Sequence, residues 1–126
     1  MKTTNTIRRH PKHSESELQR ACVKWFRLQY RQLSGVFFCV PNGGFRNAVE
    51  GAIMKGEGVL SGVSDLILLV ANSRFNGLCI EMKTAKGTQS DTQKIFMRNV
   101  EEQGYKYAIC RSFTDFQNTI NQYLSE

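Results

Sequence analysis

The sequence lacks the features that mark secreted, zinc-binding and membrane proteins. Its 126 residues include two prolines, one tryptophan and four cysteines. No two cysteines form a CxxC pair, and all stand in apolar surroundings, so we expect buried thiols and not zinc ligands or disulfides at Cys22, Cys39, Cys79 and Cys110. The longest apolar run, residues 66–71, is far too short to cross a bilayer, and the N-terminus carries no apolar export segment. We therefore expect a soluble, cytoplasmic protein with one hydrophobic core.

Acidic residues are scarce only in the first third of the chain. The whole sequence has 17 Lys and Arg against 11 Asp and Glu, a net charge of +6. Residues 1–34 hold eight basic and two acidic residues, whereas residues 35–126 hold nine of each sign. A localised basic surface favours a polyanionic partner, most simply nucleic acid, although an anionic membrane surface or a role in solubility would also accommodate it.

The hydrophobic pattern predicts one α/β domain at residues 14–126, preceded by a flexible basic arm at residues 1–13. We expect a helix from Ser14 to about Leu33, a short helix near residues 45–55, a helix between Ser90 and Gly104, and a closing helix near residues 116–124. The expected strands are residues 35–41, 65–71, 77–83 and 105–110. This order, αβ(α)ββαβα, predicts a mixed sheet with helices on both faces.

The first predicted helix has two distinct faces. Its expected buried face consists of Leu18, Ala21, Cys22, Trp25 and Gln29. A second face carries a basic stripe, Arg20, Lys24, Arg27 and Arg31. The stripe is either a solvated surface or a contact for nucleic-acid phosphates.

The segment GLCIEMK, residues 77–83, ends an apolar strand with two charged residues. If the hairpin is symmetric about Ser73, Asp65 pairs directly with Glu81, and strand alternation places Lys83 on the same side. Two opposed carboxylates repel each other, and one lysine cannot neutralise both. The pattern therefore predicts either a divalent cation bound by oxygen ligands or a structural salt bridge at the strand end.

An acid followed by E-x-K at the end of the next strand is the signature of the PD-(D/E)XK nuclease superfamily. Further segments agree: ESELQ, PNGG, GVLSGVSDLIL, GLCIEMK, a glutamine early in the following helix, and GYKYAIC. Together, over about residues 14–124, they resemble the virus-type replication-repair nuclease (VRR-NUC) family. The proline usual before the first acid is Ser64 here, a position that donates no ligand.

The resemblance implies a restriction-endonuclease-like fold and a metal-dependent DNA endonuclease. Asp65, Glu81 and the backbone carbonyl of Met82 would hold Mg²⁺ or Mn²⁺, and Lys83 would orient the attacking water. Members that consist of the nuclease domain alone are phage or prophage enzymes. They pair as homodimers and act on branched DNA such as four-way (Holliday) junctions in replication and repair. The resemblance thus implies the host cytoplasm as the site of action.

Two further polar residues have two interpretations each. Glu17 matches the family's acid in the first helix, and Gln93 matches its glutamine; both would be site residues. Glu17 also fits a capping box with Ser14, and Gln93 fits one with Ser90. Gln93 in addition shares a face with residues that we expect to pack on the sheet.

The glycine-rich segment offers candidate phosphate contacts. Glycine lets backbone amides approach a phosphate closely, and nearby basic side chains would add charge. The candidates are Asn42, Gly43, Gly44, Arg46 and Lys86. A mobile connector and a solvated lysine are the alternatives.

Two functions from other classes stay open beside the nuclease. The first is a catalytically silent nuclease-fold module that binds nucleic acid, against which the intact Asp65, Glu81 and Lys83 count. The second is an RNA-binding or regulatory protein that uses the basic arm and the first helix.

Overall fold

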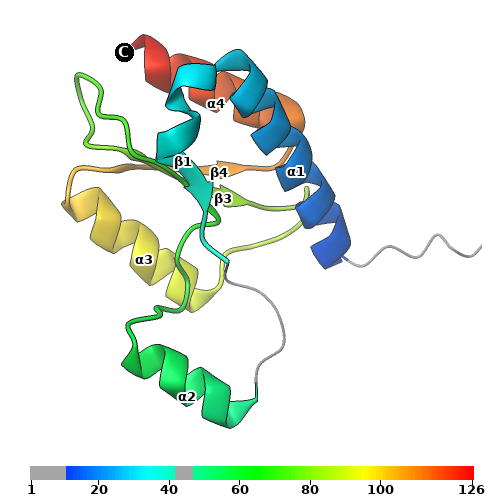
Figure 1. Ribbon diagram of the computed structural model, residues 1–126, viewed down its shortest axis with the longest axis vertical. Helices are drawn as coiled ribbons and strands as arrows, with labels where there is room; N and C mark the ends of the chain where they lie inside the picture. The colour runs from blue at the N-terminus through cyan, green and yellow to red at the C-terminus, as the bar shows by residue number, and fades with distance from the viewer. Residues whose placement is uncertain (1–10, 42–46) are drawn as a thin grey trace, which may run out of the picture.

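A four-stranded sheet lies between two groups of helices (Figure 1). The computed structural model describes residues 11–41 and 47–126. Its elements are, in chain order, α1 (Pro11–Gln29), the 3₁₀ helix η2 (Arg31–Val36), β1 (Phe37–Cys39), α2 (Ala48–Gly56), β2 (Leu66–Leu68), β3 (Leu78–Met82), α3 (Asp91–Glu102), β4 (Lys106–Cys110) and α4 (Phe113–Ser125). The predicted order αβ(α)ββαβα is confirmed, with η2 added.

The sheet is mixed, in the order β1-β2-β3-β4. The first three strands are antiparallel neighbours, and β4 runs parallel to β3 after the crossover through α3. Leu66 pairs with Ile80 and Leu68 pairs with Leu78, which is the hairpin register that the sequence predicts. Continued by one residue, this register sets Asp65 opposite Glu81.

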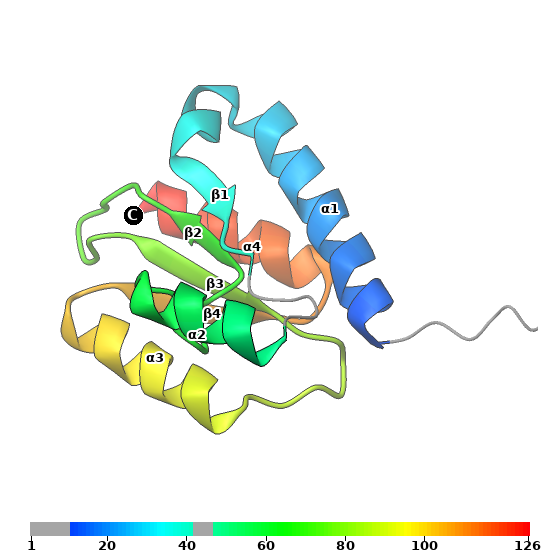
Figure 2. The same cartoon turned by 60° about the horizontal axis from the view of Figure 1, so that its bottom comes forward.

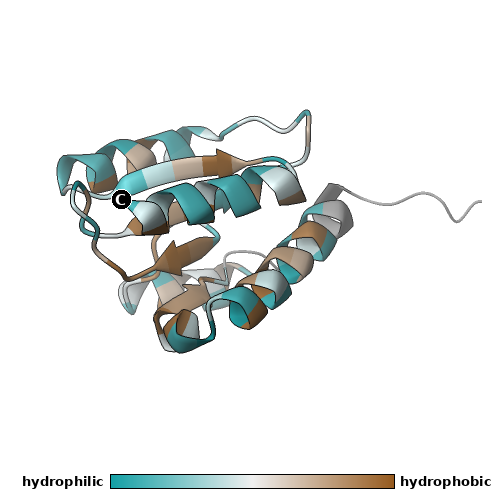
Figure 3. Ribbon diagram, turned by 90° about the horizontal axis from the view of Figure 1, so that it is seen from above, coloured by the Kyte–Doolittle hydropathy of each residue, from teal (hydrophilic) through white to brown (hydrophobic). Residues whose placement is uncertain are grey.

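One face of the sheet packs against α1 and α4 and forms the main hydrophobic core. All five residues of β3 are buried, and the side chains on this face join large aromatic residues of the two helices. The fully buried partners include Phe26, Phe116, Ile120 and Tyr123. Figure 3 shows mainly hydrophobic strands, apart from the hydrophilic start of β4, between helices of mixed character, as expected of a sheet covered on both faces.

The opposite face is covered by α3. The ring centroid of Phe96 on α3 lies 6.3 Å from that of Tyr107 on β4. The short α2 lies beside α3 and has no buried residue (Figure 2). Its ends are well formed, because Asn47 and Glu50 make a capping box at its start.

Helix α1 differs from the prediction at both ends. It begins at Pro11, within the predicted arm, because a proline is well suited to the first turn, where its missing N–H needs no partner. Ser14 therefore lies inside the helix and not at its N-cap, so the capping-box interpretation of Glu17 does not hold. The helix ends at Gln29 because Tyr30 leaves the helical conformation, at φ −124° and ψ 59°, so Arg31 belongs to η2.

The buried face of α1 is also rotated from the predicted one. Cys22 and Phe26 are fully buried, whereas Ala21 and Gln29, which the sequence places inward, are exposed. Phe26 is inside because its ring stacks on Phe37 of β1, with centroids 4.1 Å apart. Trp25 is partly buried and packs against the core, as predicted.

The edge of the sheet is shorter than predicted. Strand β1 pairs over only three residues, and β2 is limited to the same length. Leu69, which lies beyond the pairing, is 52% exposed. Cys39 is exposed at this edge, which corrects the prediction of four buried thiols; the other three are buried.

Candidate active site

Two carboxylates meet at the end of the sheet where β2 begins and β3 ends. Glu81 is completely buried on the face that α3 covers. Asp65 stands directly before β2, and its Oδ2 accepts a 2.6 Å hydrogen bond from the backbone N–H of Met82. Its main chain is fixed as well, because the N–H of Val40 donates to the carbonyl of Asp65 at 2.9 Å. The sheet thus holds the first acid against the strand that carries the second.

The two oxygens of the Glu81 carboxylate have different surroundings. Oε1 accepts hydrogen bonds from the Tyr107 hydroxyl at 2.6 Å and from Nε2 of Gln89 at 3.0 Å. Oε2 makes no hydrogen bond and lies 3.3 Å from Nζ of Lys83 in an ion pair. A buried oxygen without a hydrogen bond is costly in free energy, so this atom is the natural point for a bound cation.

Burial raises the pKa of the Asp65 carboxyl, and this effect outweighs the N–H of Met82, which lowers it. The neighbouring charges of Glu15 and Glu81 raise the same pKa, while Lys83 lowers it. The charge of Glu81 therefore lies close enough to disfavour ionisation of Asp65. One lysine compensates the two carboxylates only in part.

Lys83 is held between an acid and an amide. Its Nζ donates to Oε1 of Gln93 at 2.9 Å and forms the ion pair with Glu81. Only 12% of its side chain is exposed. The ammonium therefore sits beside the carboxylates in a defined position.

Gln93 combines the two roles that the sequence left open. The Ser90 side chain accepts from the N–H of Gln93, and the Ser90 N–H donates to Oε1 of Gln93 at 2.8 Å, which completes a capping box at the start of α3. The same Oε1 accepts from Lys83. The start of α3 and the lysine are thus joined through one oxygen.

The start of α3 is located by a glycine. Gly62 has φ +87°, and a Cβ built on it would lie 2.4 Å from the carbonyl oxygen of Thr92. Only glycine permits this backbone conformation together with such close contact. The segment before Asp65 therefore sets where Gln93 lies.

The helix acid that acts on Asp65 is Glu15. Its charge contributes to the raised pKa of Asp65. Glu17 is exposed and lies two residues further along α1, and residues two apart do not share a helix face. The sequence analysis chose Glu17 because it matches the family's acid in the first helix.

The chain after Lys83 is clamped by an arginine that the sequence analysis did not single out. Nη1 of Arg111, at the end of β4, donates to the carbonyls of Thr84 at 2.9 Å and Gly87 at 2.6 Å. Lys86 is exposed within this clamped loop. The clamp thereby fixes the backbone on both sides of this exposed lysine.

The remaining predicted contacts for nucleic acid lie outside this cluster. Arg20, Lys24 and Arg27 are exposed on α1, and Arg31 is exposed on η2. Asn42, Gly43, Gly44 and Arg46 fall outside the residues that the structure describes.

The donor set suits a hard divalent cation. Residues 11–41 and 47–126 contain no group of three or more His, Cys, Asp or Glu side chains that could hold a metal. Two carboxylates with water and a substrate phosphate are a usual set for Mg²⁺. The N–H and carbonyl of one strand residue point to the same edge, so the carbonyl of Met82 also faces Asp65. Oε2 of Glu81, which makes no hydrogen bond, is a further oxygen that such an ion would take.

Tyr107 and Gln89 are the partners of Glu81 that sequence reasoning missed. Tyr107 enters through the parallel register that pairs it with Cys79, and a crossover connection leaves this register undefined in the sequence. The one sequence feature that could have indicated Tyr107 is its position in a buried strand, where a tyrosine hydroxyl needs a hydrogen-bond partner. Gln89 lies in a loop without any periodic pattern.

The comparisons with known proteins agree with this geometry. The family model described as the VRR-NUC domain matches residues 2–114. A solved structure titled "VRR_NUC domain protein" superposes with a TM-score of 0.75, at 24% identity, over 88% of each chain, which shows a shared fold. No curated protein matches significantly. No helix in the described part of the chain is long and apolar enough to cross a membrane. Because the family model spans most of its length, this chain belongs to the VRR-NUC domain family, which implies a nuclease-type function with DNA as the substrate.

Proposed function

We propose that this protein is a metal-dependent DNA endonuclease that hydrolyses phosphodiester bonds of branched DNA. The observation that supports it best is the Glu81 carboxylate. One of its oxygens is saturated by two donors, and the other faces Lys83 without a hydrogen bond, in the neighbourhood of Asp65.

Each side chain has a distinct role in this proposal. Asp65, Glu81 and the carbonyl of Met82 would hold Mg²⁺ or Mn²⁺, which when bound supplies charge neutralisation at the phosphate and an activated water. Lys83 orients the attacking water and offsets the negative charge that develops on the phosphate. Gln93 keeps the ammonium in place, and Glu15 adds an acid at the edge of the site. Lys86 and the α1 cations contact backbone phosphates.

A substrate panel tests this function. The purified protein is incubated with Mg²⁺ or Mn²⁺ and with linear, nicked, flapped and four-way DNA. We expect cleavage that requires the metal, is abolished by a chelator and is fastest on the branched substrates. Equal cutting of all four substrates would contradict the selectivity for branches.

The variant Lys83→Ala tests the assigned chemistry. It should keep the circular-dichroism spectrum of the fold and lose at least about a hundredfold in cleavage rate. Lys106→Ala is the matched control, because Lys106 lies at the opposite end of the parallel strand pair. Cleavage that survives in Lys83→Ala would remove the proposed role of this lysine.

The second candidate is a catalytically silent module with the same fold. Such a module would bind metal and DNA in calorimetry but would show no cleavage in the substrate panel. The intact set of Asp65, Glu81 and Lys83 in one contact network favours the enzyme.

We propose in addition that the protein acts as a homodimer, with α2 in the contact. Val49 and Ile53 on this helix are 68% and 56% exposed, and Leu60 just beyond it is 58% exposed. A nine-residue helix has little stability without packing. About a two-fold axis, antiparallel copies of α2 would bury this apolar face and bring Glu50 near Lys55 of the partner subunit.

A further inference from the structure

A basic groove runs between α1 and the edge strand β1, outside the carboxylate site. It has a volume of about 370 Å³ and is open to solvent. Apolar residues form its floor and part of its walls, and three cations of α1 line its rim. The lining includes Arg20, Val23, Lys24, Arg27, Phe37 and Cys39.

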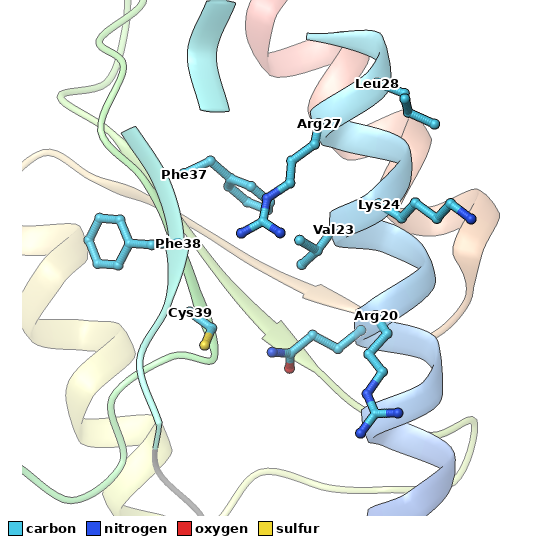
Figure 4. A pocket seen from close by; sticks show the side chains of 9 residues that line it. Arg20, Val23, Lys24, Arg27, Leu28, Phe37, Phe38 and Cys39 are labelled. Carbon is cyan, nitrogen blue, oxygen red and sulfur yellow. The ribbon is translucent and has the colours of Figure 1, made fainter. Parts of the chain in front are cut away.

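Figure 4 shows how these side chains lie. Arg27 reaches from α1 across the gap toward β1, above the ring of Phe37, and Val23 points into the same gap. Phe38 points away to the other side of β1. The groove therefore combines a hydrophobic floor with a guanidinium group that extends over it.

The cations of this groove are not neutralised within the described part of the chain. The ion pairs there join Arg74 to Glu126 and Lys83 to Glu81, and neither involves an α1 cation. Arg20 and Arg27 are two turns apart, a separation of about 10 Å along the helix. This spacing suits two separate phosphates of one strand better than a single small anion.

One end of the groove adjoins the carboxylate site. Cys39 pairs with Leu66, the residue that follows Asp65. Gln19 on the opposite wall lies one turn after Glu15, whose charge acts on Asp65. A strand that lies in the groove would therefore lead toward the end of the sheet where Asp65 lies.

We infer that this groove holds an unpaired strand of the DNA substrate. Its volume is that of a small-molecule site, too small to take the side of a double helix. Apolar floors that accept bases or sugars, lined by cations that follow the backbone, are typical of single-strand binding. The inference rests on the proposed nuclease function and defines its substrate class as DNA with a single-stranded arm beside the cleaved duplex.

Binding measurements in a chelator test the groove without cleavage. Fluorescence anisotropy compares a blunt duplex with the same duplex carrying an unpaired arm. In Arg27→Gln we expect about tenfold weaker binding of the armed DNA, a several-fold smaller loss on the blunt duplex, and a salt slope that is shallower by about 0.7. Arg98→Gln, which removes an exposed cation from α3, is the matched control and should change neither affinity.

A second variant tests the open volume of the groove and leaves its charge unchanged. Val23→Phe fills the groove from its half-buried wall and should also weaken binding of the armed DNA selectively, with the melting temperature recorded as a check of folding. Equal losses on both DNAs, or no loss in either variant, would overturn the inference. It would also be overturned if the variants changed the oligomeric state, which would indicate a second copy in the groove, or if an oligoglutamate peptide competed as well as the arm.

The outcomes are separable from those of the nuclease proposal. Cleavage that depends on Lys83 with no selective effect of Arg27→Gln would reject the groove alone. Selective binding of the arm without any cleavage would reject the nuclease alone.

Discussion

At the level of single residues, Glu81 shows how a buried charge is oriented by its neighbours. Tyr107 and Gln89 both donate to Oε1, which leaves Oε2 directed toward Lys83. Burial and the charge of Glu81 raise the pKa of the Tyr107 phenol. The phenol therefore stays protonated at neutral pH and can always donate. Such outer partners hold a metal-binding carboxylate in one orientation.

Tyr107→Phe removes this donor without changing the shape of the side chain. We expect Mn²⁺ affinity to fall at least about tenfold, because the carboxylate would no longer be fixed by its strongest hydrogen bond. Isothermal titration calorimetry measures the affinity directly. Tyr123→Phe is the matched control, since its hydroxyl donates a 2.6 Å bond to the carbonyl of Val70 away from the site. The control should lose about 1 kcal/mol of stability and keep its metal affinity. Equal metal affinities in the two variants would contradict the positioning role of Tyr107.

At the level of elements, the site depends on where the start of α3 lies. Ser90 caps the helix, Gln93 links the cap to Lys83, and Gly62 packs directly on the first turn. Arg111 clamps the loop that joins β3 to α3. The loop between β3 and α3 thus has fixed contacts near both of its ends.

Gly62→Ala would place a methyl group against the backbone of Thr92 in a left-handed conformation. We expect a loss of at least about 2 kcal/mol in the free energy of unfolding, measured by chemical denaturation. The displaced helix start should also weaken cleavage through Gln93. Gly51→Ala is the control, because Gly51 lies in α2 with open space around it and alanine favours a helix. Unchanged stability in Gly62→Ala would show that α3 can shift freely.

At the level of the whole molecule, apolar and basic side chains are unevenly distributed over the surface. One sheet face, with α1 and α4, encloses the aromatic core, while apolar side chains of α2 are exposed. The basic groove lies along α1. The proposed DNA surface and the proposed subunit contact therefore use different elements.

Ile53→Glu tests the subunit contact. A charge in the centre of the α2 face should convert a dimer to a monomer, because it would be buried without a partner. Sedimentation velocity measures the mass in solution. Leu69→Glu is the control, since Leu69 is similarly exposed but follows β2. A wild-type monomer, or a dimer that survives Ile53→Glu, would contradict the proposed contact.

Much of the fold could be predicted because its signals are local. The alternation of β3, the hairpin register and the Ser90 and Gly104 boundaries of α3 depend on residues that are near in sequence, and all are confirmed. The errors lie where distant residues decide. Phe26 is buried because Phe37 stacks on it, and the pairing of β1 with β2 is limited to three residues.

The sequence by itself determined that two acids and a lysine occupy one side of a hairpin, because side chains alternate along a strand with a period of two. Only the tertiary structure decided what surrounds them. The parallel pairing of β4 with β3 places Tyr107 beside Glu81, and a close backbone contact places Gly62 against the start of α3. The direction of α1 places Glu15 where its charge acts on Asp65. These contacts join residues across long stretches of chain, where packing of the assembled core, and not local conformational preference, sets the distances.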